Sequence, residues 1–78
     1  MSRYFFDLHN GNGPVLDEEG QELASRESVA MEVGRILGDI ARDEMPETCN
    51  GTIALTVRDA TGRTITVARL TFSNEWTD

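Results

Sequence analysis

Hydrophobic and polar positions alternate with a period of two near the start of the chain, over residues 3–9. Alternation of this kind places successive side chains on opposite faces of a β-strand. One face of the predicted strand carries Tyr4, Phe6 and Leu8. The other face carries Phe5, Asp7 and His9. The pattern therefore predicts a half-buried first strand.

Two turn signals follow this strand. Residues 10–13 read Asn-Gly-Asn-Gly, and both residue types tolerate positive φ angles. Val15 and Leu16 then predict a short return strand, which makes a hairpin with residues 3–9. Residues 17–20 read Asp-Glu-Glu-Gly, with glycine in a position that a tight turn favours.

The middle of the chain carries the period of an amphipathic helix. Ser25 is a plausible N-cap, and Glu27 in the first turn offsets the helix dipole. The helix ends near Glu44, because Pro46 biases the preceding residue out of the α region. The apolar positions are spaced i, i+4, i+7, i+8 and i+11, at Val29, Val33, Ile36, Leu37 and Ile40.

A row of small residues lies beside this apolar stripe. Its members are Ala30, Gly34, Gly38 and Ala41. A glycine inside a helix costs about 1 kcal/mol relative to alanine, so the two glycines need a packing reason. Two explanations stay open: close approach of the helix to its own sheet, or a helix-to-helix contact in a dimer.

Two further strands are predicted in the second half. Ile53, Leu55 and Val57 alternate with polar or small residues, and residues 59–62 form a hairpin turn. The last strand has two phases, Ile65 with Val67 and Leu70 with Phe72. A β-bulge near residues 68–69 would reconcile the two phases, as would a strongly twisted strand.

These elements predict an α+β fold in a single domain, residues 1–78. The order strand, strand, helix, strand, strand gives a two-layer structure, with an antiparallel four-stranded sheet and one helix packed on one face. The expected sheet side of the core is Tyr4, Phe6, Leu8, Ile53, Leu55, Val57, Ile65 and Val67. The open face would carry Phe5, Ala54, Ala68 and Leu70. It is too apolar for ordinary surface, so we expect a partner chain or the segment around Trp76 to cover it.

Composition narrows the classes of partner. Fourteen acidic against seven basic residues give a net charge of −7, which repels phosphate backbones and anionic lipid headgroups. We therefore expect no nucleic-acid and no membrane partner. Cys49 is the only cysteine, so an internal disulfide is excluded. With no apparent leader segment, a cytoplasmic location is expected.

One segment approaches a calcium-binding motif. Residues 8–19 place Asn, Asn, Gly and Glu at the third, fifth, sixth and twelfth positions of a calcium loop. The first position needs a carboxylate and holds Leu8, and the flanks predict strands instead of helices. A polar hairpin loop is the simpler interpretation. The weak candidate metal ligands are Asp7, His9, Asn10, Asn12, Asp17 and Glu19.

Catalysis and cofactor binding find little support. Asp7 and His9 share one face of a strand and could form an acid–base pair, but two groups do not make a site. Cys49 with His9 offers no spacing typical of a thiol nucleophile. No glycine-rich loop opens a helix as nucleotide sites require. We expect no enzyme activity and no cofactor.

The opening block carries a family resemblance. Residues 3–11 read Arg-Tyr-Phe-Phe-x-Leu-His-x-Gly, and residues 17–23 read Asp-Glu-x-Gly-x-Glu-Leu. With the helix that follows and the turn at residues 59–62, this arrangement resembles a family of short alphaproteobacterial proteins of unknown function. The resemblance implies a small cytosolic bacterial protein and assigns no activity, substrate or catalytic residue.

Three functions remain open. The first is a non-enzymatic protein-interaction or regulatory module, expected to be a homodimer. The second is an antitoxin-like adaptor whose acidic surface docks on a basic partner. The third is a metal or small-ligand binder using the hairpin loop and the acidic run. The candidate interface residues are Phe5, Gly34, Gly38, Leu70, Phe72 and Trp76.

Overall fold

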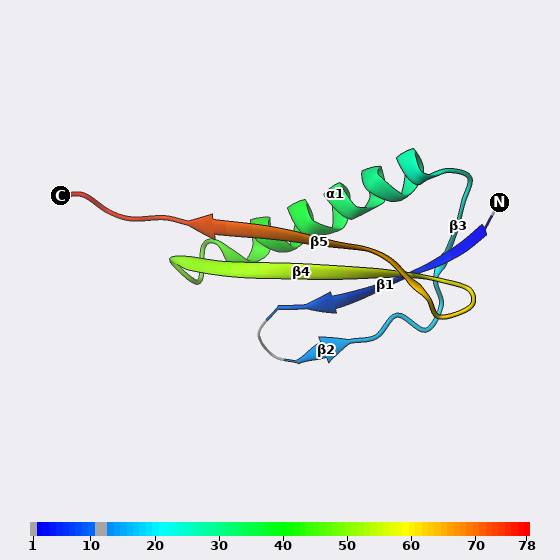
Figure 1. Cartoon of the computed structure of the whole chain (residues 1–78). Coiled ribbons are helices and arrows are strands. Elements are labelled where there is room, and N and C mark those ends of the chain that lie inside the picture. Colours follow the sequence, from blue (N-terminus) through cyan, green and yellow to red (C-terminus); the bar gives the residue numbers. More distant parts are fainter. Residues whose placement is uncertain (1, 11–12) are drawn as a thin grey trace.

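The structure, a computed structural model, describes residues 2–10 and 13–78. This part of the chain folds into an antiparallel sheet with a helix packed on one face, which confirms the predicted α+β class (Figure 1). The strands hydrogen-bond in the order β2-β1-β4-β5, and β3 pairs with the other end of β1. The elements are β1 (Ser2–His9), β2 (Pro14–Val15), β3 (Gln21–Leu23), α1 (Arg26–Glu44), β4 (Asn50–Asp59) and β5 (Thr64–Ser73).

The outer side of β1 differs from the prediction. The sequence predicted four strands, and the described residues contain a fifth, the short β3, which pairs Ser2, Arg3 and Tyr4 with residues 21–23. The return strand β2 comprises Pro14 and Val15, one residue earlier than expected. Both strands are too short to carry a periodic pattern, which explains why the sequence located them poorly.

Helix α1 begins and ends where the sequence predicts. The Ser25 hydroxyl accepts a hydrogen bond from the Ser28 backbone N–H, as an N-cap does. Glu32 accepts a 2.6 Å hydrogen bond from Gln21 of β3, which fixes this flank of the helix on the β1 side of the sheet. In the described residues no helix is long and apolar enough to cross a membrane.

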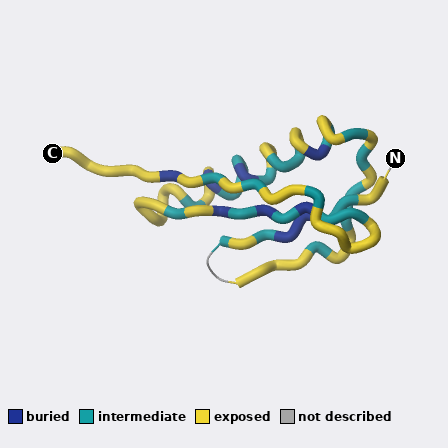
Figure 2. Tube along the Cα trace, viewed as in Figure 1, coloured by how far each residue is buried: buried dark blue, intermediate teal, exposed yellow. Residues whose placement is uncertain are grey.

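The core lies between α1 and the central strands. Ile53, Leu55 and Val57 of β4 are almost completely buried (Figure 2), as alternate residues on the covered face of a central strand should be. The prediction that Val67 belongs to the core is wrong, since 45% of this residue is exposed. Apart from Val67, the predicted core residues are buried or pack against the core, joined by Leu23, Ala41, Ala68, Leu70 and Phe72.

The phase of β5 explains why Val67 is exposed while Ala68, Leu70 and Phe72 join the core. The register shift in the β4–β5 pair lies at Val57 and Arg58, beyond which Thr64 pairs with Arg58 and Thr66 with Val57. The bulge predicted near residues 68–69 is therefore wrong. Because the irregularity falls at the start of β5, residues 66–72 keep one phase. Ala68 and Leu70, expected on the open face, point to the covered face, as does Phe72.

The helix glycines do not meet the sheet. A Cβ added at Gly34 or Gly38 would have no other atom within 4 Å. The prediction of close approach between these glycines and their own sheet is therefore wrong. Gly34 is exposed and lies two residues from Glu32, hence about 160° around the helix from the flank that faces β3. The row of small residues thus lies toward the β5 side of the molecule.

The C-terminal segment does not cover the open face. After β5 the chain runs on as an extended segment, away from the rest of the molecule (Figure 1). Trp76 in this segment is 82% exposed. The expectation that Trp76 shields the open sheet face is wrong, and that face is instead covered in part by residues 17–20 and the Arg58 side chain.

Candidate functional site

Asp7 is the buried centre of the predicted site. It was expected to be an exposed candidate ligand, but only 4% of it is exposed. Arg58 lies on β4 two residues beyond Thr56, the residue that pairs with Asp7, and donates to both carboxylate oxygens, from Nε to Oδ2 at 2.6 Å and from Nη2 to Oδ1 at 3.0 Å. This is a bidentate charged pair, the strong form of a carboxylate contact. The Arg58 guanidinium also lies over the Phe5 ring, 5.2 Å from its centroid.

Asp17 is tied to the same pair through its backbone. Its N–H donates to Asp7 Oδ1 at 2.9 Å, and its carbonyl accepts from Arg58 Nη2 at 3.2 Å. Buried charges are tolerated when they are paired and their remaining hydrogen bonds are made. The group formed by Asp7, Asp17 and Arg58, called the carboxylate cluster below, thus holds the chain after β2 against β1.

The Asp17 side chain completes the outer edge of β1. On that side β2 pairs with Leu8 and His9, and β3 pairs with residues 2–4. The Phe6 N–H lies between these two pairings and donates to Asp17 Oδ2 at 3.1 Å. A backbone N–H left without a partner in this half-buried position would carry the cost of its lost hydration. Asp17 therefore replaces a missing strand residue at this point of the ladder.

The same carboxylate also organises the turn that leads to β3. Asp17 Oδ1 accepts from the backbone N–H groups of Glu19 and Gly20, each at 3.1 Å. Gly20 has φ +71°, and a Cβ there would lie 2.8 Å from the Tyr4 carbonyl oxygen and 2.9 Å from the Phe5 ring. Glycine is required here both for its backbone angle and for the close approach to β1.

These contacts stabilise the charged forms of both carboxylates. The hydrogen bonds from Arg58 lower the pKa of Asp7 against the opposing effect of burial. Burial raises the pKa of Asp17, but the N–H groups of Phe6, Gly20 and Glu19 together outweigh it and leave the pKa below its usual value. Both groups remain ionised in neutral solution, with their oxygens used by the protein itself.

The other predicted ligands are not drawn together. His9 and Glu19 are exposed, Asn10 is half-buried, and Asn12 lies outside the described residues. Leu8 pairs with Val15 across the hairpin, so the calcium-like segment has extended strands at its ends instead of helices. No group of three or more His, Cys, Asp or Glu residues able to hold a metal ion occurs in residues 2–10 and 13–78.

A second surface, missed by the sequence reasoning as a site, lies at the opposite edge of the sheet. Strand β5 pairs with β4 on one side and ends the strand order on the other. The Asn74 N–H donates to the Cys49 carbonyl, in line with the β4–β5 register. Since hydrogen-bonding direction alternates along a strand, Val67, Arg69 and Thr71 point their backbone groups outward. We call this the free edge of β5.

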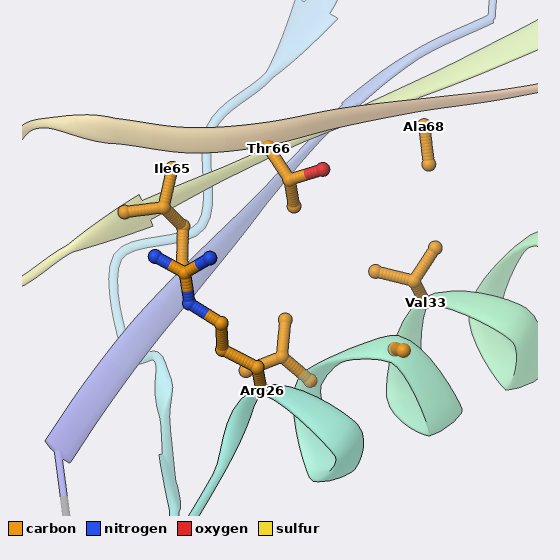
Figure 3. A pocket seen from close by; sticks show the side chains of 7 residues that line it. Arg26, Val33, Ile65, Thr66 and Ala68 are labelled. Atoms are coloured by element: carbon orange, nitrogen blue, oxygen red, sulfur yellow. The ribbon is translucent and has the colours of Figure 1, made fainter.

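An apolar cavity of about 350 Å³ lies along this edge, between α1 and β5. Val33 and Arg26 of the helix face Ile65, Thr66 and Ala68 of β5 across it (Figure 3). Val29 and Ala30 complete its lining. Exposed residues alternate with more buried ones along β5, and the segment after it is exposed throughout (Figure 2). The free edge of β5 thus combines unpaired backbone groups with an apolar recess.

Replacing Asp17 should separate the structural role of this carboxylate from that of its neighbours. We expect Asp17→Ala to lower the free energy of unfolding by about 2 kcal/mol, because three backbone N–H groups lose their acceptor. The adjacent, exposed Glu18 provides a matched control, and Glu18→Ala should change stability by less than about 0.5 kcal/mol. Urea unfolding measures both; equal effects would contradict the assigned role.

Acid should weaken the fold through the same groups. The folded-state pKa values of Asp7 and Asp17 are lowered, so their contribution is fully present above their unfolded pKa of about 3.9. It is lost as the pH falls through the folded values. Urea midpoints should therefore decrease steeply below about pH 4. Asp17→Asn should flatten this decrease, and an unchanged pH dependence in that variant would count against the account.

Comparison with known proteins agrees with the expectation of a family of unknown function. The family described as Domain of unknown function (DUF6894) matches residues 3–71. The match runs from β1 into β5 and includes the whole carboxylate cluster. No curated protein matches the chain. No solved structure matches it. On the extent of the family match, the chain belongs to the DUF6894 family of domains of unknown function.

Proposed function

We propose that this protein is a non-enzymatic interaction module that acts as a homodimer, joined along the free edge of β5. The observation that carries the proposal is the ten-residue length of β5 at the end of the strand order. A long edge strand with unpaired N–H and C=O groups is a template for pairing with another chain. Proteins that remain monomeric usually shorten, cover or heavily charge such an edge.

The residues of β5 offer little protection against pairing. Between Thr64 and Ser73 the strand contains one charged residue, Arg69, and no proline or glycine. The other residues are β-branched, small or apolar, which suits a strand with neighbours on both sides. A two-fold axis beside β5 would join two such edges antiparallel and extend the sheet across both protomers.

The helix flank above this edge supports the same arrangement. Gly34 is exposed, and open space surrounds the Cβ positions of Gly34 and Gly38. Edge pairing would bring the α1 helices of two protomers onto the same side of one continuous sheet. Small residues on the facing flanks let the helices approach closely, which gives the two glycines a packing reason.

The carboxylate cluster supports the non-enzymatic part of the proposal. Its acidic oxygens accept hydrogen bonds from Arg58 and from backbone N–H groups, so they are engaged in holding the fold. The region from Asp7 to Glu19, which resembled a ligand site in the sequence, thus has a structural role. The surface open to partners lies on the other side of the sheet.

A proline in the edge strand tests the proposal. Thr71 points its N–H outward, so Thr71→Pro removes one intermolecular donor and leaves the β4–β5 hydrogen bonds intact. We expect wild-type protein to be a dimer at micromolar concentration, and Thr71→Pro to weaken dimerisation at least tenfold. Size-exclusion chromatography with light scattering measures the mass of each.

Thr71→Val is the matched control. Both variants lose the 3.2 Å hydrogen bond between the Thr71 and Thr52 hydroxyls, but valine keeps the backbone N–H. Thr71→Val should therefore dimerise like wild type. If Thr71→Pro does not fold by circular dichroism, Val67→Pro with Val67→Thr repeats the comparison at another outward position. A wild-type protein that stays monomeric at about 100 µM would overturn the proposal.

A further inference from the structure

We infer that Trp76 from one protomer occupies the apolar cavity between α1 and β5 of the other, so that the segment after β5 exchanges between the two chains. This inference rests on the proposed homodimer and names the contact that completes it. The site is the cavity of about 350 Å³ beside Arg26, Ala30 and Ile65. The occupant is a second copy of this chain.

The side chains that line the cavity suit an occupant that carries both an aromatic ring and a carboxylate. Its walls are mainly the apolar side chains of Val29, Val33 and Ile65, and Arg26 extends along one end (Figure 3). Within residues 2–10 and 13–78, no carboxylate lies close enough to Arg26 to form an ion pair. An occupant with an indole ring and a carboxylate would match both features.

The segment after β5 offers those two groups together. Residues 74–78 read Asn-Glu-Trp-Thr-Asp, with Glu75 and Asp78 on either side of Trp76. Trp76 is the only tryptophan of the chain, and 82% of it is exposed in a single protomer. Tryptophan side chains that are largely exposed in a single protomer are common at surfaces that a partner covers. The segment extends beyond the end of its own sheet, where Trp76 lies beside residues 45–49 and stays mostly exposed (Figure 1).

The register of an antiparallel β5 pair decides where the segment lies. Opposite residues point to the same face, so the even-numbered residues 66–72, which face the helix, must oppose even-numbered residues of the partner. An axis at Arg69 would place two guanidinium groups directly opposite, which is unfavourable. Axes at Thr71 and Phe72 keep the two arginines apart and place Trp76 opposite Thr66 or Ala68, both of which line the cavity.

The charges of β5 and the segment after it are compatible with the Thr71 register. With the axis at Thr71, the outward pairs are Thr71 with Thr71, Arg69 with Ser73, and Val67 with Glu75. Glu75 then lies diagonally from Arg69 on the open face, a neighbouring position that long side chains reach. Asp78 follows Trp76 by two residues, so it lies on the same face of the segment, toward the end of the cavity where Arg26 and Ile65 lie. Each protomer donates and receives one tail, as a two-fold axis requires.

The single tryptophan makes the contact measurable. We expect the Trp76 emission maximum to shift to shorter wavelength as the protein concentration rises, in step with the dimer fraction from light scattering. Trp76→Ala should keep the fold and weaken dimerisation about tenfold or more, because a buried tryptophan is a typical interface anchor. Leu16→Ala removes another exposed apolar side chain, far from β5, and should leave dimerisation unchanged.

A cavity-filling variant tests the receiving side. Ala30 is exposed and lines the cavity, so Ala30→Phe should occupy the site without disturbing the core. The emission of Trp76 should then stay that of an indole in water in the remaining dimers. Met31→Phe adds the same ring on the exposed outer side of the helix and should behave as wild type.

The outcomes separate this inference from the proposed function. A dimer whose Trp76 emission does not shift, or whose affinity is unchanged in Trp76→Ala, would overturn the exchange of the segment and leave edge pairing intact. A blue-shifted emission in samples that light scattering shows to be monomeric would also overturn it, because the ring would then be buried within one chain. A protein that never dimerises would overturn both.

Discussion

The structure depends on how the backbone N–H groups of β1 find hydrogen-bond acceptors on the side of the strand that faces away from β4. Two short strands share that edge, and neither supplies a partner for Phe6. The Asp17 carboxylate accepts the Phe6 N–H, and the Asp7–Arg58 pair anchors the Asp17 backbone from the neighbouring face. In a chain of 78 residues, a partly buried ion pair and a half-buried N–H must both be satisfied locally, because little core is available to offset a loss.

This constraint divides the sheet into two different edges. The β1 side is closed by β2, β3 and the carboxylate cluster, and so the carboxylates of Asp7 and Asp17 are committed to the fold. The β5 side has no comparable cover, and it carries an apolar cavity beneath a helix flank with exposed small residues. The β1 edge, which carries the carboxylate cluster, therefore has a structural role. The β5 edge is the one suited to binding.

The sequence predicted those parts of the fold that have a period. The helix, the alternation of β4 and the burial of Phe6 all follow from repeats of 3.6 or 2 residues. It did not predict the pairing of Asp7 with Arg58, which are 51 residues apart and acquire their geometry from the β1–β4 register. The burial of Phe72 was missed because the position of one register shift sets the phase of β5.

Residue-by-residue amide hydrogen exchange tests the account most directly, because one experiment reports on both edges of the sheet. We expect the Phe6 amide to exchange slowly at every protein concentration, since Asp17 accepts its hydrogen bond. The amides of Val67, Arg69 and Thr71 should exchange slowly only at concentrations where the dimer forms. Rapid exchange of these three amides in concentrated samples would contradict the central claim that the free edge of β5 is the interface.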